Sequence, residues 1–156
     1  EWEPRGNTVH ACLEAFLKGK PYDPGPYRDW VEPLLNYKLW DRYEAVASEF
    51  QMCDMRFDTG GIGGTADCIL RHKKTGKYVL ADLKTLSASG RSRDISAQLG
   101  GYISLLGHVK PEIQISNCIA IWSKPHETFT TTFNPIICKD VYEAQRKYFF
   151  SQQPQI

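Results

Sequence analysis

The chain has 156 residues, a length that suits one domain with a single substantial core. Apolar residues make up 42% and charged residues 24%, as in ordinary globular proteins, and no run reaches the roughly 18 apolar residues of a membrane span. The net charge of +1 neither supports nor excludes a polyanionic partner, since a nucleic-acid enzyme needs positive charge only beside its site.

The first predicted element is an amphipathic helix, because apolar residues recur at helical spacing over positions 9–17. Asn7 or Thr8 is expected to cap its start, and Gly19 to end it. The turn-forming residues of 21–26 (Pro-Tyr-Asp-Pro-Gly-Pro) then predict a loop.

A second helix is predicted to begin near Pro33, since proline is tolerated at a first helical position. Its apolar stripe continues to Val46, and a short strand is expected through Glu49 and Phe50. The glycine-rich segment 60–64 predicts a turn.

The second half of the chain predicts a β-hairpin, a helix, two more strands and a final helix. The hairpin strands are expected over 65–71 and 77–84, with a turn within 73–76. Apolar periodicity predicts a helix beginning near Asp94. This order predicts an α/β protein with a central mixed β-sheet flanked by helices.

The hairpin brings together the residues with the clearest chemical potential. A two-residue loop at Thr75 and Gly76 sets Asp67 opposite Lys84, and a four-residue loop leaves the facing unchanged. In either case Asp67, Asp82 and Lys84 project from one face. The opposite face is then uniformly apolar, with Ala66, Cys68, Leu70, Val79, Ala81 and Leu83.

Two carboxylates and an ammonium on one face suit a site for a hard divalent cation. Asp67 and Asp82 could hold Mg²⁺ or Mn²⁺, with the backbone carbonyl of Leu83 as a further ligand. Lys84 could orient an attacking water or neutralise charge on a phosphate. The alternative is a surface salt bridge between Asp67 and Lys84, worth about 0–1 kcal/mol.

Several segments in order resemble the PD-(D/E)XK nuclease superfamily in its RecB-like exonuclease branch. The segments are Gly6-Asn7-Thr8-Val9-His10, Glu49, Gly64-Thr65-Ala66-Asp67, Asp82-Leu83-Lys84 and Gln98-Leu99-Gly100-Gly101-Tyr102. The resemblance implies a restriction-endonuclease-like core over 1–156 as a single domain. It also implies a metal-dependent enzyme that hydrolyses phosphodiester bonds in DNA.

The resemblance assigns roles to individual residues. Asp67, Asp82 and Lys84 would be catalytic, and the ligands of Mg²⁺ or Mn²⁺ would be His10, Asp67, Asp82, the backbone carbonyl of Leu83 and, as a further candidate, Glu49. Gln98 and Tyr102 would position substrate. Without the resemblance, a histidine in the position of His10 is more often a core residue, and Gln98 and Tyr102 are interpreted as the polar flank of a helix. Glu14, one helical turn after His10, is either an assistant or a surface charge.

Two further features lie beside these motifs. Arg91 and Arg93 fall in a flexible loop before the helix, where they suit phosphate binding or form an ordinary solvated loop. Gly100 and Gly101 cost about 1 kcal/mol each in a helix interior, which indicates close approach by another element or by a DNA backbone.

The function expected from the resemblance is an exonuclease acting on DNA ends or single strands in recombination, repair or phage DNA metabolism, with a possible recombination or replication partner protein. The alternatives are an endonuclease of the same fold and a non-catalytic nucleic-acid-binding module. The start of the sequence lacks a signal-peptide layout, so a cytoplasmic protein of a prokaryote or phage is expected. Five cysteines without a C-x-x-C pair suggest neither a zinc site nor an iron–sulfur cluster.

Overall fold

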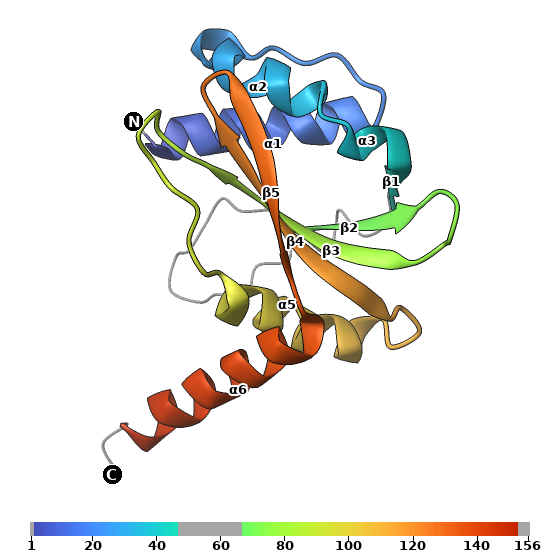
Figure 1. Ribbon diagram of the computed structural model, residues 1–156, viewed down its shortest axis with the longest axis vertical. Helices are drawn as coiled ribbons and strands as arrows, with labels where there is room; N and C mark the ends of the chain where they lie inside the picture. The colour runs from blue at the N-terminus through green and yellow to red at the C-terminus, as the bar shows by residue number, and fades with distance from the viewer. Residues whose placement is uncertain (1, 47–66, 153–156) are drawn as a thin grey trace.

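The structure, a computed structural model, describes residues 2–46 and 67–152 and has an α/β fold (Figure 1). A five-stranded mixed sheet lies between helices on both faces. The elements in chain order are α1 (Trp2–Leu17), the 3-10 helix η1 (Gly25–Tyr27), α2 (Arg28–Leu35), α3 (Leu39–Arg42), β1 (Tyr43–Ala45), β2 (Asp67–His72), β3 (Tyr78–Thr85), α5 (Ser96–Val109), β4 (Ile115–Lys124), β5 (Glu127–Phe133) and α6 (Pro135–Ser151).

The strands are ordered β1-β2-β3-β4-β5, so that β3 is the central strand. β3 and β4 are parallel and are connected through α5, whereas the other neighbouring strands are antiparallel. This arrangement confirms the predicted mixed α/β sheet. Among the described residues, no helix combines the length and apolar character that a bilayer crossing requires.

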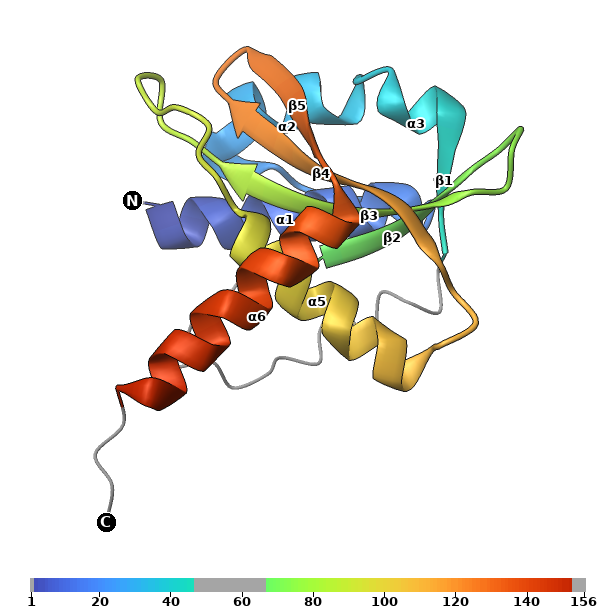
Figure 2. The ribbon, with the colours of Figure 1, turned by 60° about the horizontal axis from the view of Figure 1, so that its bottom comes forward.

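Alternation along β3 divides its side chains between two cores. Val79, Ala81 and Leu83 belong to the cluster that includes residues of α1 and α2, together with Cys68 and Leu70 of β2. Leu80 faces the other cluster, built with α5, α6 and β4. Figure 2 shows α1 and α2 on one side of the sheet and α5 and α6 on the other. The predicted apolar face is thereby confirmed, except for Ala66, which lies outside the described residues.

The hairpin turn has four residues, 73–76, since the His72 N–H donates to the Lys77 carbonyl at 2.8 Å. Gly76 has a φ of 73°, which suits glycine and agrees with the predicted turn. The register pairs Asp67 with Asp82. The alternative with Lys84 opposite Asp67 is therefore wrong, although the two registers differ by two residues and keep the same faces.

The first helix is longer than its apolar pattern. α1 begins at Trp2, so Asn7 and Thr8 are interior residues and not caps. Tertiary contacts hold its first turns, because Arg5 Nε donates to Thr85 Oγ1 at 3.2 Å and the guanidinium lies 5.4 Å from the centre of a Trp30 ring. The helix ends before Gly19, as predicted, with φ of 70° at that glycine.

The second helix begins at Arg28, and the prediction that it begins near Pro33 is wrong. Pro33 lies inside α2, where it has no N–H to donate to the Asp29 carbonyl one turn earlier. That carbonyl accepts from the His126 N–H at 2.8 Å, so a distant turn satisfies it. The chain then forms α3 and β1 in place of one continued helix, and the strand expected at Glu49 and Phe50 lies outside the described residues.

The paired glycines of α5 are explained by α6 and not by a DNA backbone. A Cβ on Gly100 would overlap the Cys138 carbonyl oxygen, and one on Gly101 would lie 3.2 Å from Tyr142 Cε1. The absence of side chains at these positions lets the two helices cross closely. Close packing by another element is thus the reason for the two glycines.

We expect Gly100→Ala to destabilise the protein by about 1–3 kcal/mol, since the helices must move apart. Gly107 lies in the same helix with open space around its Cβ position. Gly107→Ala should therefore stabilise by up to about 1 kcal/mol. Urea denaturation measures both changes, and equal effects of the two substitutions would contradict the packing argument.

Candidate functional site

Asp82 and Lys84 lie on the central strand, on the face covered by α5. Asp82 is 0% exposed and Lys84 is 8% exposed. Lys84 Nζ lies 3.2 Å from Asp82 Oδ2 and donates a hydrogen bond to Gln98 Oε1 at 2.8 Å. The ammonium is therefore fixed between a carboxylate on its own strand and an amide on α5.

The Asp82 carboxylate lacks the hydrogen bonds that a buried acid usually has. Within the described part of the chain, neither oxygen has a hydrogen-bond partner, because the nearby Lys84 ammonium is not aligned as a donor. A buried polar group without hydrogen bonds is costly, typically about 1–3 kcal/mol and more for a charged group. The carboxylate thus retains unused capacity to bind a cation or a donor.

His10 lies on α1 and approaches the same part of β3. Nδ1 is 2.8 Å from the Gly6 carbonyl oxygen, which can only accept, so Nδ1 carries the proton in that contact. Nε2 is buried and has no hydrogen-bond partner among the described residues. In the neutral ring this leaves the Nε2 lone pair available for a metal ion.

Burial lowers the pKa of His10 below its usual 6.5, because a charged ring is disfavoured away from water. The Gly6 carbonyl, the Asp82 carboxylate and the Leu83 backbone act in the opposite direction, and Lys84 lowers the pKa further. The ring therefore lies near the Leu83 backbone, and the Asp82 and Lys84 charges act on it electrostatically. The net lowering of the pKa favours the neutral form that coordinates metals.

The structure describes little of the two other predicted acidic ligands, Asp67 and Glu49. Asp67 begins β2 with its backbone paired to Asp82. Its side chain and all of Glu49 fall outside what the structure describes. Among the described side chains, no three His, Cys, Asp or Glu gather to hold a metal ion.

The remaining predicted residues occupy different surroundings. Gln98 contacts Lys84, whereas Tyr102, one turn later on α5, is partly buried and packs against the core cluster on that face. Arg91 and Arg93 are exposed between β3 and α5, and the Arg93 guanidinium lies 5.7 Å from the centre of a Trp122 ring. Trp122 is fully buried and pairs with Lys84 in the sheet register, so Arg93 lies close to the site.

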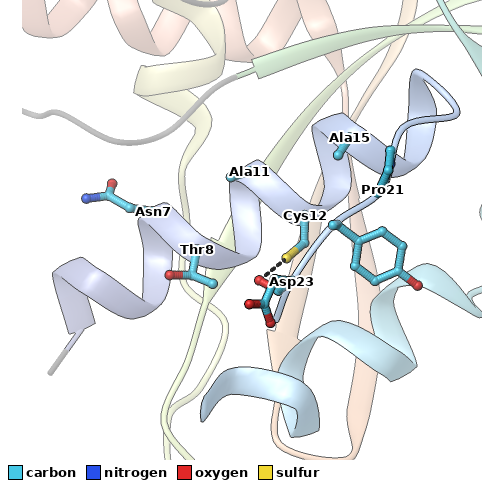
Figure 3. Close-up of a pocket in the computed structure, with 8 residues that line it drawn as sticks. Asn7, Thr8, Ala11, Cys12, Ala15, Pro21 and Asp23 are labelled. Atoms are coloured by element: carbon cyan, nitrogen blue, oxygen red, sulfur yellow. Dashed lines mark hydrogen bonds between the residues drawn. The ribbon is translucent and has the colours of Figure 1, made fainter. Parts of the chain in front are cut away.

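Glu14 forms an ion pair with Lys18 at 2.6 Å on the surface of α1, which supports its interpretation as a surface charge. A hollow of about 410 Å³ lies along another side of the same helix (Figure 3). Its lining consists of Asn7, Thr8, Ala11, Cys12, Ala15, Pro21, Tyr22 and Asp23. His10 is not part of this lining, so the hollow is separate from the site on β3.

Sequence reasoning missed two contacts. Gln98 was expected to bind substrate, but its carbonyl oxygen accepts from Lys84, and helical periodicity gives no signal of that cross-layer hydrogen bond. Arg5 contacts Thr85, which follows Lys84 directly, and only its place before the Gly6–His10 motif could have drawn attention to it.

No model of a known protein family matches the chain, and no curated protein is similar to it in sequence. The resemblance to PD-(D/E)XK nucleases therefore rests on the sequence motifs alone.

We expect the free energy of unfolding to fall as the pH decreases below the usual histidine value of 6.5. In that range the unfolded chain binds a proton that buried His10 does not bind, and the loss is complete below the lowered pKa of the folded state. His10→Gln should remove this component, whereas His108→Gln, at an exposed position on α5, should not. Denaturation in EDTA across a pH series tests this, and an identical pH profile for wild type and His10→Gln would contradict it.

Proposed function

We propose that the chain is a metal-dependent deoxyribonuclease with a restriction-endonuclease-like PD-(D/E)XK core. The observation that carries this proposal is the fully buried Asp82 carboxylate, whose oxygens have no hydrogen-bond partner in the described part of the chain. Its charge acts on His10, whose buried Nε2 has no hydrogen-bond partner among those residues either. Carboxylate oxygens and an imidazole nitrogen that lack hydrogen-bond partners are electron-rich groups suited to a divalent cation. The ion expected is Mg²⁺ or Mn²⁺.

The residues around this pair fit such an ion. His10, Asp82 and the Leu83 backbone would hold it, with Asp67 opposite Asp82 and Glu49 as further candidates. An imidazole ligand shifts the preference toward Mn²⁺ compared with an all-oxygen site. When bound, the ion would polarise a phosphoryl oxygen and lower the pKa of a bound water.

Lys84 supplies the positive charge that phosphodiester hydrolysis requires close to the phosphate. Its ammonium is fixed by Asp82 and Gln98 and is mostly shielded from water. In such surroundings a fixed charge stabilises a developing negative charge more strongly than it would in water. Lys84 would orient the attacking water or offset charge on the phosphate, and Gln98 would position Lys84.

A merely structural ion pair explains these features less well. The sequence left open a surface salt bridge between Asp67 and Lys84. In the structure, however, Lys84 forms its ion pair with Asp82, and this pair is buried. Burying two charges costs several kcal/mol per ion unless further hydrogen bonds satisfy them. Because the Asp82 oxygens have none among the described residues, a bound cation accounts for the arrangement better than stability does.

DNA cleavage is expected in the presence of Mg²⁺ or Mn²⁺ and not in EDTA. Asp82→Asn, which preserves side-chain size, and Lys84→Gln, which removes the charge, should each lower the rate about 100-fold or more while circular dichroism shows a retained fold. Arg71→Ala is the control, since Arg71 forms an exposed 3.0 Å ion pair with Glu44 elsewhere on the sheet.

The substrates are end-labelled linear DNA and covalently closed circles. Cleavage restricted to linear DNA supports an exonuclease, and cleavage of circles an endonuclease of the same fold. Full activity of Asp82→Asn or Lys84→Gln, or no cleavage with any metal, would contradict the proposal. The absence of cleavage with every metal would favour a non-catalytic nucleic-acid-binding module.

Gln98→Leu should lower kcat about tenfold and leave KM almost unchanged, because it removes the acceptor that positions Lys84. Gln98→Glu keeps an acceptor oxygen and should retain more activity. Steady-state kinetics distinguish a role of Gln98 in positioning Lys84 from a role in binding substrate. A raised KM with normal kcat would assign Gln98 to substrate binding instead.

A further inference from the structure

The C-terminal half of α6 stands clear of the sheet and carries three large exposed rings. Tyr148, Phe149 and Phe150 are 68%, 60% and 59% exposed. The first half of the helix packs on α5 through Cys138 and Tyr142, whereas Figures 1 and 2 both show the second half extending away from the other elements. Helical periodicity places Phe149 two turns after Tyr142, in line with the face that packs on α5, and turns Tyr148 and Phe150 about 100° to either side of it.

The spacing of the rings argues against a second helix as their partner. A helix seam uses positions three and four apart, whereas these rings occupy consecutive positions, each turned about 100° from the last. One flat or helical surface cannot cover all three. A flexible strand that bends around the helix end can contact each in turn.

The charge around the rings indicates the chemistry of that strand. From Ala144 to Ile156 the sequence contains Arg146 and Lys147 and no Asp or Glu. The Arg146 guanidinium lies 5.5 Å from the centre of the Phe150 ring, and the Phe149 and Phe150 rings meet edge to face at 5.7 Å. Exposed rings interleaved with cations bind single-stranded nucleic acid, whose bases stack while phosphates pair with the cations.

We propose that Arg146–Phe150 forms a stacking platform for single-stranded DNA. Strand binding by α6 can be measured without cleavage, so the platform can be tested separately from the proposed nuclease function.

The experiment measures fluorescence anisotropy of a labelled oligothymidine, and of a duplex of equal length, with the full chain in EDTA. Phe149→Ser/Phe150→Ser should weaken single-strand binding about tenfold or more and duplex binding much less. Phe149→Trp/Phe150→Trp should retain affinity, since the larger rings still stack. The matched control is Ile136→Ser/Ile137→Ser, an equally exposed apolar pair (72% and 58%) at the other end of the same helix.

Unchanged single-strand affinity of the serine variant would overturn the inference, as would an equal loss in the isoleucine control. Light scattering provides a second readout. If the wild-type chain is a dimer that the serine variant converts to a monomer, the rings form an interface between copies and the inference is wrong. Binding by α6 without any cleavage would contradict the proposed function alone, and cleavage with unchanged binding would contradict this inference alone.

Discussion

The Asp82 carboxylate sits on the middle strand of the sheet, shut off from water and without a hydrogen bond from the described residues. A carboxylate in that position requires a compensating positive charge, and Lys84 on the same strand face supplies part of it. Lys84 in turn requires an acceptor, which α5 provides through Gln98. The position of α5 is set by its close crossing with α6, where Gly100 leaves room for the Cys138 carbonyl. The site on β3 therefore depends on packing between two helices that carry few of its residues.

His10 approaches the same strand from α1, which belongs to the opposite helical layer. Its ring is held by the Gly6 carbonyl one turn earlier, so the orientation of Nε2 is determined within α1 itself. Arg5 extends the contact by donating to Thr85, directly after Lys84. Two layers of helices thus converge on the last four residues of β3, which explains how a site can lie inside a sheet and still receive groups from both sides.

Sequence patterns predicted those elements whose periodicity is local. The hairpin strands expected over 65–71 and 77–84 correspond to β2 (67–72) and β3 (78–85), and the helix expected from near Asp94 corresponds to α5 (96–109). These elements and the turn that ends at Gly76 could be predicted because apolar alternation and turn residues act over a few positions. The start of α2 and the first turns of α1 were not predicted, because contacts with residues distant in sequence stabilise them. The free carbonyl created by Pro33 is satisfied by the His126 N–H, almost a hundred residues later in the chain, and no local pattern contains that information.

By itself, the sequence determined that Asp82 and Lys84 belong to one face of β3, because side chains alternate with period two, and it predicted Asp67 on the same face for any even register. Only the tertiary structure decided that Asp82 and not Lys84 stands opposite Asp67. It also decided that the pair is buried and that Gln98 binds the ammonium. Burial and hydrogen bonding between layers depend on how helices distant in sequence pack on the sheet. Hydrophobic periodicity predicts which face of an element is buried, but it does not predict which residues of other elements contact that face.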